Sequence, residues 1–230
     1  MSRFASAYER LEREWLPRFD ILLVASEEDR RRVAHPNVIV YPNALPEKAL
    51  VPERSVQDPE TIVFSGNLEY HPNIEAVRWF AAHIWPRIRS RAPETVWKLV
   101  GRNEHAVRAI VGKGEGIAFT GPIDDAIAAL ASAKVCVVPL LSGSGTRFKI
   151  LEAWAAARAV VSTTLGAEGL GAIDGQHLLI ADDADSFADA VLRLLDDDGL
   201  RGRLGAAGRA LYIDRFTWPA AWRALESAEI

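Results

Sequence analysis

The stretch VCVVPLLSGSGTRFKILEAWAAA, residues 135–157, decides the fold. It opens on an apolar, β-branched run, which is typical of a parallel strand buried on both faces. Gly143 and Gly145 follow, and glycine lets the backbone turn sharply and approach a ligand because no Cβ is in the way. A helix is expected to start at Thr146. A strand, a glycine turn and a helix in this order predict one unit of an α/β fold.

The expected helix start has the chemistry of an anion site. A helix N-terminus exposes free N–H groups and a partial positive charge, which suits a phosphate. Arg147 and Lys149 add two cations that oppose the helix dipole unless an anion compensates, and such local conflicts are typical of functional sites. Glu152 follows Lys149 by one helical turn, so its carboxylate can accept the two hydroxyls of a ribose. The side chains expected to face the core are Ile150, Leu151 and Trp154.

A purely structural interpretation of this segment also stays open. A glycine turn can lead into an ordinary helix on which Lys149 and Glu152 form a surface ion pair. Ser144 lies in G-S-G and not in the G-x-S-x-G turn of hydrolases. The histidines include no pair with metal-ligand spacing, and the single cysteine, Cys136, excludes disulfides and Cys-based zinc sites, so no metal is expected.

Further apolar runs on both sides of this unit predict a parallel sheet. The strand candidates are 21–25, 38–41, 61–65, 96–100, 117–120, 135–140, 159–162 and 178–181. The expected helices between and after them are 73–91, a helix capped by Asp124 and ending at Ala133, 185–197, 200–212 and 218–228. Alternation of strands and helices predicts an open, Rossmann-like sheet with helices on both faces, in which ligands bind at the carboxyl ends of the strands.

The chain divides into three expected parts. Residues 1–45 form a helix and strand remnant of another domain, ending in a proline-rich linker over residues 43–57. Residues 46–215 form the Rossmann-like domain, and residues 216–230 form a C-terminal helix. Exposed apolar surface is expected near Phe4, Trp15, Trp218 and Trp222, where the rest of an N-terminal domain or a second copy could dock.

Composition limits the class of protein. The 230 residues carry a net charge of -4, so no basic nucleic-acid-binding face is indicated. No apolar stretch is long enough to cross a bilayer, and the charged first residues do not resemble a signal peptide. A cytoplasmic protein is expected, with peripheral association at the inner membrane face left open.

Several segments together resemble a known family. GSGTRFKILEA (143–153) and VVSTTLGAEGL (160–170) are similar to the C-terminal domain of GT-B glycosyltransferases of family 4, the group 1 glycosyl transferases. The segments IVFSGNLEYHPNIEAV, VWKLVGRN, IAFTGPIDD and CVVPL agree in the same order. The resemblance implies retaining transfer of a hexose from a UDP-, GDP- or ADP-type sugar donor to a sugar, lipid or polysaccharide precursor, with no required cofactor. It also implies that the helix of residues 216–230 is a crossover helix that packs back on residues 1–45.

The resemblance also implies roles for individual residues. Glu152 matches the glutamate that holds the ribose hydroxyls, and Arg147 and Lys149 complete the expected catalytic group. Donor contacts are expected from four glycine-containing loops: Gly66 and Asn67, Gly101 and Arg102, Thr120 to Ile123 with Gly121, and Gly143, Ser144, Gly145 and Thr146. Leu151 and Glu168 complete this set, although Glu168 could instead order its own loop.

Two positions depart from the family pattern. Ser144 stands where the family often has a first glutamate that touches the sugar, so the sugar and its geometry stay open. The turn after Gly66 reads NLEYH and lacks the cations that often bind the diphosphate there. We expect Arg147 and Lys149 to supply that charge. A sugar-nucleotide 2-epimerase of similar fold and a non-catalytic binding module remain alternatives.

Overall fold

The computed structural model describes residues 3–46, 60–112 and 114–226. Its strands are β1 (Leu22–Val24), β2 (Val38–Val40), β3 (Thr61–Ser65), β4 (Val96–Val100), β5 (Ile117–Phe119), β6 (Val135–Val138), β7 (Ala159–Ser162) and β8 (Leu179–Ile180). Its helices are α1 (Arg3–Trp15), α2 (Glu27–Arg32), α3 (His71–Trp79), α4 (Trp85–Arg91), α5 (His105–Val111), α6 (Ala126–Ala131), α7 (Phe148–Ala155), α8 (Ala184–Asp196), α9 (Asp198–Arg215) and α10 (Trp218–Glu226). Short 3-10 turns, η1 (Leu16–Arg18) and η4 (Leu165–Ala167), and a π-helical segment, η3 (Phe80–Ile84), complete the described elements.

Six strands form one parallel sheet in the order β5-β4-β3-β6-β7-β8. The chain builds the sheet outward from β3 in one direction and then crosses to β6, so β3 and β6 are neighbours at the point where the strand order reverses. This arrangement confirms the Rossmann-like sheet predicted from the sequence, and each predicted strand lies within a residue or two of an observed one. The carboxyl ends of β3 and β6 are therefore where a ligand is expected.

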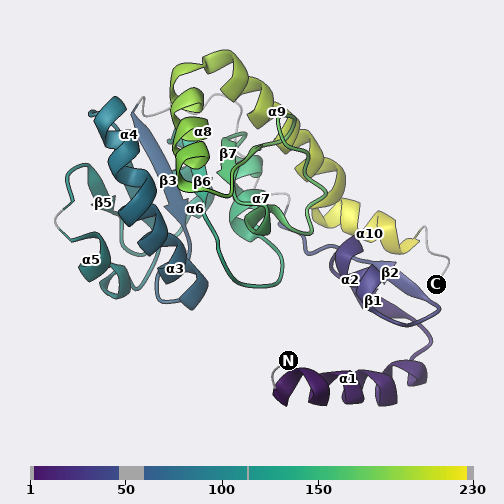
Figure 1. Ribbon diagram of the computed structural model, residues 1–230. Coiled ribbons are helices and arrows are strands. Elements are labelled where there is room, and N and C mark those ends of the chain that lie inside the picture. Colours follow the sequence, from purple (N-terminus) through teal and green to yellow (C-terminus); the bar gives the residue numbers. More distant parts are fainter. Residues whose placement is uncertain (1–2, 47–59, 113, 227–230) are drawn as a thin grey trace.

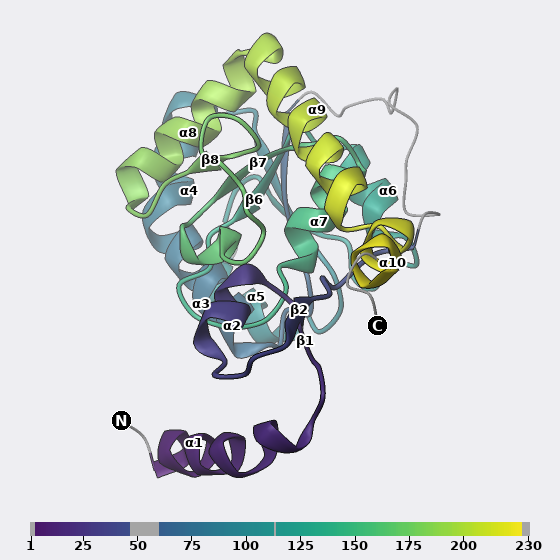
Figure 2. The same cartoon turned by 90° about the vertical axis from the view of Figure 1, so that its right-hand side faces the viewer.

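Helices cover both faces of this sheet (Figures 1 and 2). One layer contains α3, η3, α4 and α8. In this layer Phe187 of α8 packs edge-on against Trp79 of α3 and Phe80 of η3. The other layer contains α6, α7 and α9. Cys136 lies in the buried β6, and burial raises the pKa of its thiol to about 12, as expected for a small core hydrophobe.

Several element boundaries differ from the sequence-based expectation. The helix expected from Thr146 begins at Phe148, because Arg147 has a non-helical backbone, with φ -84° and ψ 62°, and serves as the N-cap. The cap expected at Asp124 is instead Asp125, whose carboxylate accepts the amide hydrogen of Ala128. The helix His105–Val111 was not predicted.

The helix expected over residues 73–91 is continuous but irregular. It starts at His71 and contains the π-helical segment η3 before α4. Pro86 lies in the first turn of α4, lacks an amide hydrogen and cannot donate to the carbonyl one turn earlier, so the hydrogen-bond pattern changes there.

The N-terminal segment lies beside the sheet domain. Strands β1 and β2 form a separate two-stranded parallel sheet, and α1 stands away from the rest of the molecule (Figure 1). Helix α10 returns to this segment, where Trp222 packs edge-on against Tyr41. Trp15, Trp218 and Trp222 are exposed, as expected. Most of the expected linker, residues 47–57, lies outside the described residues, and the division into domains stays a prediction.

Candidate functional site

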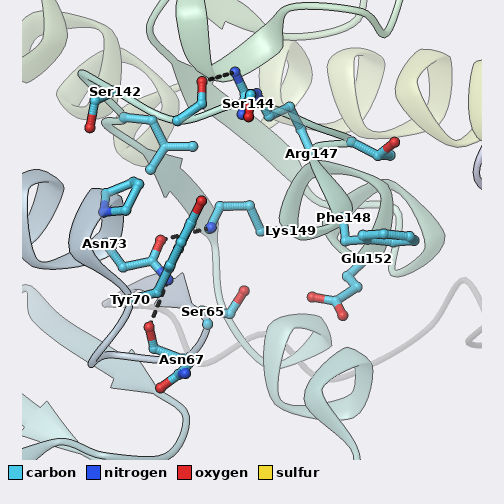
Figure 3. A pocket seen from close by; sticks show the side chains of 15 residues that line it. Ser65, Asn67, Tyr70, Asn73, Ser142, Ser144, Arg147, Phe148, Lys149 and Glu152 are labelled. Carbon is cyan, nitrogen blue, oxygen red and sulfur yellow. Dashed lines mark hydrogen bonds between the residues drawn. The ribbon is translucent and has the colours of Figure 1, made fainter. Parts of the chain in front are cut away.

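A cleft of about 340 Å³ lies at the carboxyl ends of β3 and β6 (Figure 3). One wall comes from the turn after β3 and the start of α3. The other comes from the loop after β6 and the start of α7. The lining residues are Ser65, Gly66, Asn67, Tyr70, Pro72, Asn73, Leu140, Ser142, Gly143, Ser144, Thr146, Arg147, Phe148, Lys149 and Glu152. The reversal of strand order therefore coincides with a cavity, as it does in other open α/β sheets.

The turn after β3 needs glycine at Gly66. Its φ of +147° is unfavourable for other residues, and a Cβ on it would come within 2.9 Å of the Asn73 side-chain nitrogen. Gly101 supports this turn from behind, since a Cβ there would lie 1.9 Å from the Gly66 carbonyl oxygen. Gly66 also lines the cleft, and a ligand can approach its backbone closely because the residue has no side chain.

Lys149 reaches across the cleft toward this turn. Its ammonium donates to Asn73 Oδ1 at 3.0 Å and lies 5.4 Å from the centre of the Phe64 ring. Burial lowers the pKa of Lys149 to about 8, with a further decrease from Arg147 that Glu152 opposes. A desolvated ammonium with a neutral partner is a strong site for an anion.

Glu152 lies one turn further along α7, at the edge of the same cleft (Figure 3). Burial raises the pKa of its carboxyl group, and the nearby Lys149 charge partly offsets this increase. No ion pair within 4 Å joins Glu152 to Lys149 among the described residues. The surface ion pair considered in the sequence interpretation is therefore absent, and the carboxylate is available as an acceptor.

Arg147 has a different environment from Lys149. Its side chain is 5% exposed, and its guanidinium donates to the carbonyl oxygens of Leu165 and Gly143 at 3.1 and 3.2 Å. The Glu168 carboxylate lies 3.6 Å away. Arg147 lines the cleft, but its hydrogen bonds hold the loop after β6 against the loop after β7. Both cations line the cleft, and the expectation that they supply charge to a diphosphate stays a prediction.

The sequence interpretation did not single out Asn73 or Tyr70, which also line the cleft. Asn73 is 3% exposed, and its amide nitrogen donates to the Asn67 carbonyl at 2.8 Å while its oxygen accepts from Lys149. The only sequence signal for Asn73 is its place in the first turn of a helix that follows a strand and a glycine turn. That signal specifies no partner.

The cleft brings together about half of the residues expected from the sequence. Those lining it are Gly66, Asn67, Gly143, Ser144, Thr146, Arg147, Lys149 and Glu152. The side chain of Leu151 is fully buried, as its expected core-facing position predicts, and its role as a donor contact stays a prediction. The residues following the outer strands do not line the cleft: Gly101, Arg102, Thr120, Gly121 and Ile123. The sheet order separates β5 from β3 by one strand, which places the loop after β5 further along the same edge.

Glu168 and Gly145 line a second, smaller cleft between the sheet domain and the N-terminal segment. The Glu168 carboxylate accepts from Arg32 at 3.1 Å, and Asn43 Nδ2 donates to the Thr146 hydroxyl at 2.5 Å. Ser144 and Thr146 line both clefts, so the two are adjacent. The loop after β6 therefore contacts both the first cleft and the N-terminal segment.

No group of three or more His, Cys, Asp or Glu side chains within residues 3–46, 60–112 and 114–226 has an arrangement that could hold a metal ion. Among the helices of those ranges, none combines the length and apolar character needed to cross a bilayer. Asp183, one of three neighbouring aspartates, caps α8 by accepting from the amides of Asp185 and Ser186.

Several curated proteins are similar to this chain in sequence. A phosphatidyl-myo-inositol mannosyltransferase of Mycolicibacterium smegmatis is 36% identical over 140 residues, which cover 58% of this chain and 36% of that protein. A protein encoded in the cps region of Klebsiella pneumoniae is 27% identical over 139 residues, 57% of this chain and 36% of that protein. The match thus spans about a third of the length of these curated relatives.

Structural comparison gives the same architecture. TarM of S. aureus superposes with a TM-score of 0.75 at 15% identity, covering 92% of this chain and 44% of TarM. HepE of Anabaena, solved in complex with UDP and glucose, superposes with a TM-score of 0.71 at 12% identity, covering 91% and 62% of the two chains. These neighbours are GT-B glycosyltransferases, and at such identities they establish the fold.

The family model described as glycosyl transferases group 1 matches residues 59–197, more than half of the chain. The matched range includes both walls of the cleft and every strand of the six-stranded sheet. The chain belongs to the group 1 glycosyl transferase family.

Proposed function

We propose that this chain is the donor-binding part of a glycosyltransferase, and that its first cleft holds the diphosphate and ribose of a nucleoside-diphosphate sugar. One observation carries the proposal: a glycine turn, a desolvated ammonium and a carboxylate converge where the strand order reverses. Phosphate binding favours an exposed backbone and a nearby cation. Ribose binding favours a carboxylate acceptor.

Different residues are proposed to contact different parts of the donor. Lys149 and the Gly66 backbone bind the diphosphate, and the first amides of α7 lie beside it. Glu152 accepts the ribose hydroxyls. The loops of Gly101 and Arg102 and of Thr120 to Ile123 follow the neighbouring strands and would contact the nucleoside. Arg147 contributes positive charge to the cleft, and its hydrogen bond to the Gly143 carbonyl oxygen fixes the loop after β6.

The chemical role of this site is electrostatic. Glycosyl transfer develops negative charge on the departing nucleoside diphosphate, and fixed positive groups lower the barrier by stabilising that charge. Lys149, Arg147 and the start of α7 supply such groups. Transfer with retention at the anomeric carbon is the outcome we propose by analogy with the family.

Two of the similar proteins guide the choice of substrates to test. HepE was solved with UDP, and a mannosyltransferase acting on phosphatidyl-myo-inositol is among the relatives. We therefore propose a UDP-, GDP- or ADP-linked hexose as donor and a saccharide or lipid-linked acceptor. An acceptor of the second kind would bring the protein to the inner face of a membrane.

The acceptor is expected to bind outside the described residues. The match covers about a third of the curated relatives' length, and the second cleft opens toward the N-terminal segment. We propose that the acceptor site needs a further domain or a second copy. The exposed Trp15, Trp218 and Trp222 offer apolar surface for such a contact.

Isothermal titration calorimetry of the 230-residue chain against UDP, GDP, ADP and their hexose conjugates tests this function. Tight binding of one nucleoside diphosphate, with weaker binding of its monophosphate, is the expected result. Binding of none would contradict the proposal and favour a non-catalytic interaction module. Release of a free 2-epimerised sugar from a bound donor would instead favour an epimerase.

A further inference from the structure

Asn73 connects the two walls of the cleft through one side chain (Figure 3). Its amide nitrogen donates to the Asn67 carbonyl at 2.8 Å, on the β3 wall. Its amide oxygen accepts from the Lys149 ammonium at 3.0 Å, on the α7 wall. The residue is 3% exposed, so both contacts are shielded from water. A buried amide with both ends bonded has few alternative orientations, which fixes the atoms that it contacts.

The Gly66 turn also limits the size of the side chain at position 73. The Asn73 nitrogen would lie 2.9 Å from a Cβ on Gly66, so the amide packs directly under the glycine turn. Asn73 lies in the first turn of α3, and Pro72 before it limits the backbone there. A larger side chain would displace the Gly66 turn. The backbone that faces the cleft therefore depends on the shape of Asn73.

The neutrality of the amide matters as much as its geometry. An aspartate at this position would place a carboxylate about 3 Å from the ammonium and cancel its charge for any incoming anion. The charged groups that influence the pKa of Lys149 are Glu152 on α7 and Arg147 at its N-cap. Helix α3, which carries Asn73, also carries Glu75 and His71. Glu75 is engaged by the Ser142 hydroxyl, and Arg147 by backbone carbonyls.

We propose that Asn73 is a positioning residue, which holds the Lys149 ammonium against the Gly66 turn without neutralising its charge, so that both meet the diphosphate together. This inference rests on the proposed function of the cleft. It goes further in assigning a role to a residue that contacts no reacting atom. Asn73 acts through Lys149, so removing the ammonium should remove most of the effect of changing Asn73.

A double-mutant cycle tests this dependence. Affinity for the nucleoside diphosphate that the wild type binds best among UDP, GDP and ADP is measured by calorimetry at pH 7. The proteins are the wild type, Asn73→Asp, Lys149→Met and the double variant. Asn73→Asp is expected to weaken binding about 10-fold in the wild-type background, because a neutralised ammonium loses its attraction for the anion. In the Lys149→Met background, the same Asn73→Asp substitution should weaken binding less than about 2-fold.

The pH profile gives a second readout that a purely structural role would not change. Wild-type affinity should fall as pH rises through about 8, where Lys149 loses its proton. In Asn73→Asp the neighbouring carboxylate stabilises the ammonium, so this inflection should move up by about one pH unit or more. Circular dichroism melting of each variant verifies that it is folded, and Lys134→Ala, at the opposite end of β6, serves as the matched control.

The outcomes separate this inference from the proposed function. Equal affinities of the wild type and Asn73→Asp from pH 6 to 10 would overturn the inference alone. Equal losses in the two Lys149 backgrounds would also overturn it, since Asn73 would then act independently of the ammonium. Absence of binding by the folded wild type would overturn the proposed function and this inference with it.

Discussion

The two walls of the cleft are built alike and charged differently. Each consists of a strand, a glycine turn and the start of a helix, and the two units are neighbours in the sheet. The turn after β3 carries no cation and presents backbone and the neutral Asn73. The turn after β6 carries Arg147 and Lys149. The wall after β3 therefore contributes a neutral surface of defined shape, and the wall after β6 contributes the positive charge.

The two cations of the charged wall also differ from each other. Arg147 is buried, and its guanidinium is engaged by two backbone carbonyls. Lys149 is desolvated and has a neutral amide as its hydrogen-bond partner. The first arrangement stabilises a loop, whereas the second leaves positive charge available to a ligand. This difference predicts opposite effects on stability when each is replaced.

The largest expected effect concerns the cost of burying the Lys149 ammonium. Its pKa is about 8 in the folded protein, against 10.5 for an ordinary lysine side chain, so the unfolded chain carries more protons between these values. The free energy of unfolding should therefore rise with pH from about 8 to 10.5, by up to about 3 kcal/mol relative to Lys149→Met. Urea unfolding of both proteins at pH 7 and pH 10.5 measures this difference. A constant difference would show that the ammonium is not desolvated.

Replacement of Lys149 should also have the largest effect on binding. Lys149→Met should lower affinity for a nucleoside diphosphate about 100-fold at pH 7, because a charge-assisted contact is lost. Affinity for the matching nucleoside should change little. Calorimetry with both ligands measures the contrast, with Lys134→Ala as control. Similar losses for nucleoside and diphosphate would mean that Lys149 does not contact the phosphates.

Arg147→Ala should lower stability rather than binding specificity. The substitution leaves the carbonyl oxygens of Gly143 and Leu165 without their buried donor, which costs about 2 kcal/mol in the free energy of unfolding. Urea unfolding at pH 7 tests this, with the exposed Arg32→Ala as a matched arginine control. An unchanged stability for Arg147→Ala would contradict the structural role given to this arginine.

Replacement of Glu152 should have a smaller effect on affinity, and this effect should depend on the ribose and not on the phosphates. Glu152→Gln should weaken binding of a ribonucleoside diphosphate about 10-fold, because an amide accepts hydroxyl hydrogens less strongly than a carboxylate. It should hardly change binding of the 2′,3′-dideoxy analogue. Calorimetry with the two nucleotides provides the comparison, and equal losses for both would exclude a ribose contact.

Much of the sheet and part of the site could be predicted from the sequence. Several strands are apolar runs rich in β-branched residues, and the predicted strand positions agree closely with the structure. The start of α7 was misplaced because Arg147 bonds the Gly143 carbonyl and leaves the helical conformation, a choice that local propensity does not encode. The side chain of Leu151 faces the core, as the helical pattern predicts, whereas its donor contact rests on the resemblance alone and stays a prediction.

The contacts that complete the cleft could not be predicted. Asn73 and Lys149 are 76 residues apart, and only the reversal of strand order between β3 and β6 brings them together. Glu168 and Arg32 are 136 residues apart and meet across the second cleft. A single sequence carries the residue types of such a site but not which of them become neighbours.

A crystal structure of the chain with its preferred nucleoside diphosphate tests the central claim most directly. The account predicts phosphate oxygens within hydrogen-bond distance of Lys149 Nζ and of the Gly66 turn, ribose hydroxyls on Glu152, and Arg147 still bonded to the Gly143 carbonyl. A nucleotide bound outside this cleft, or with its phosphates on Arg147 and away from Lys149, would contradict the division of shape and charge between the two walls.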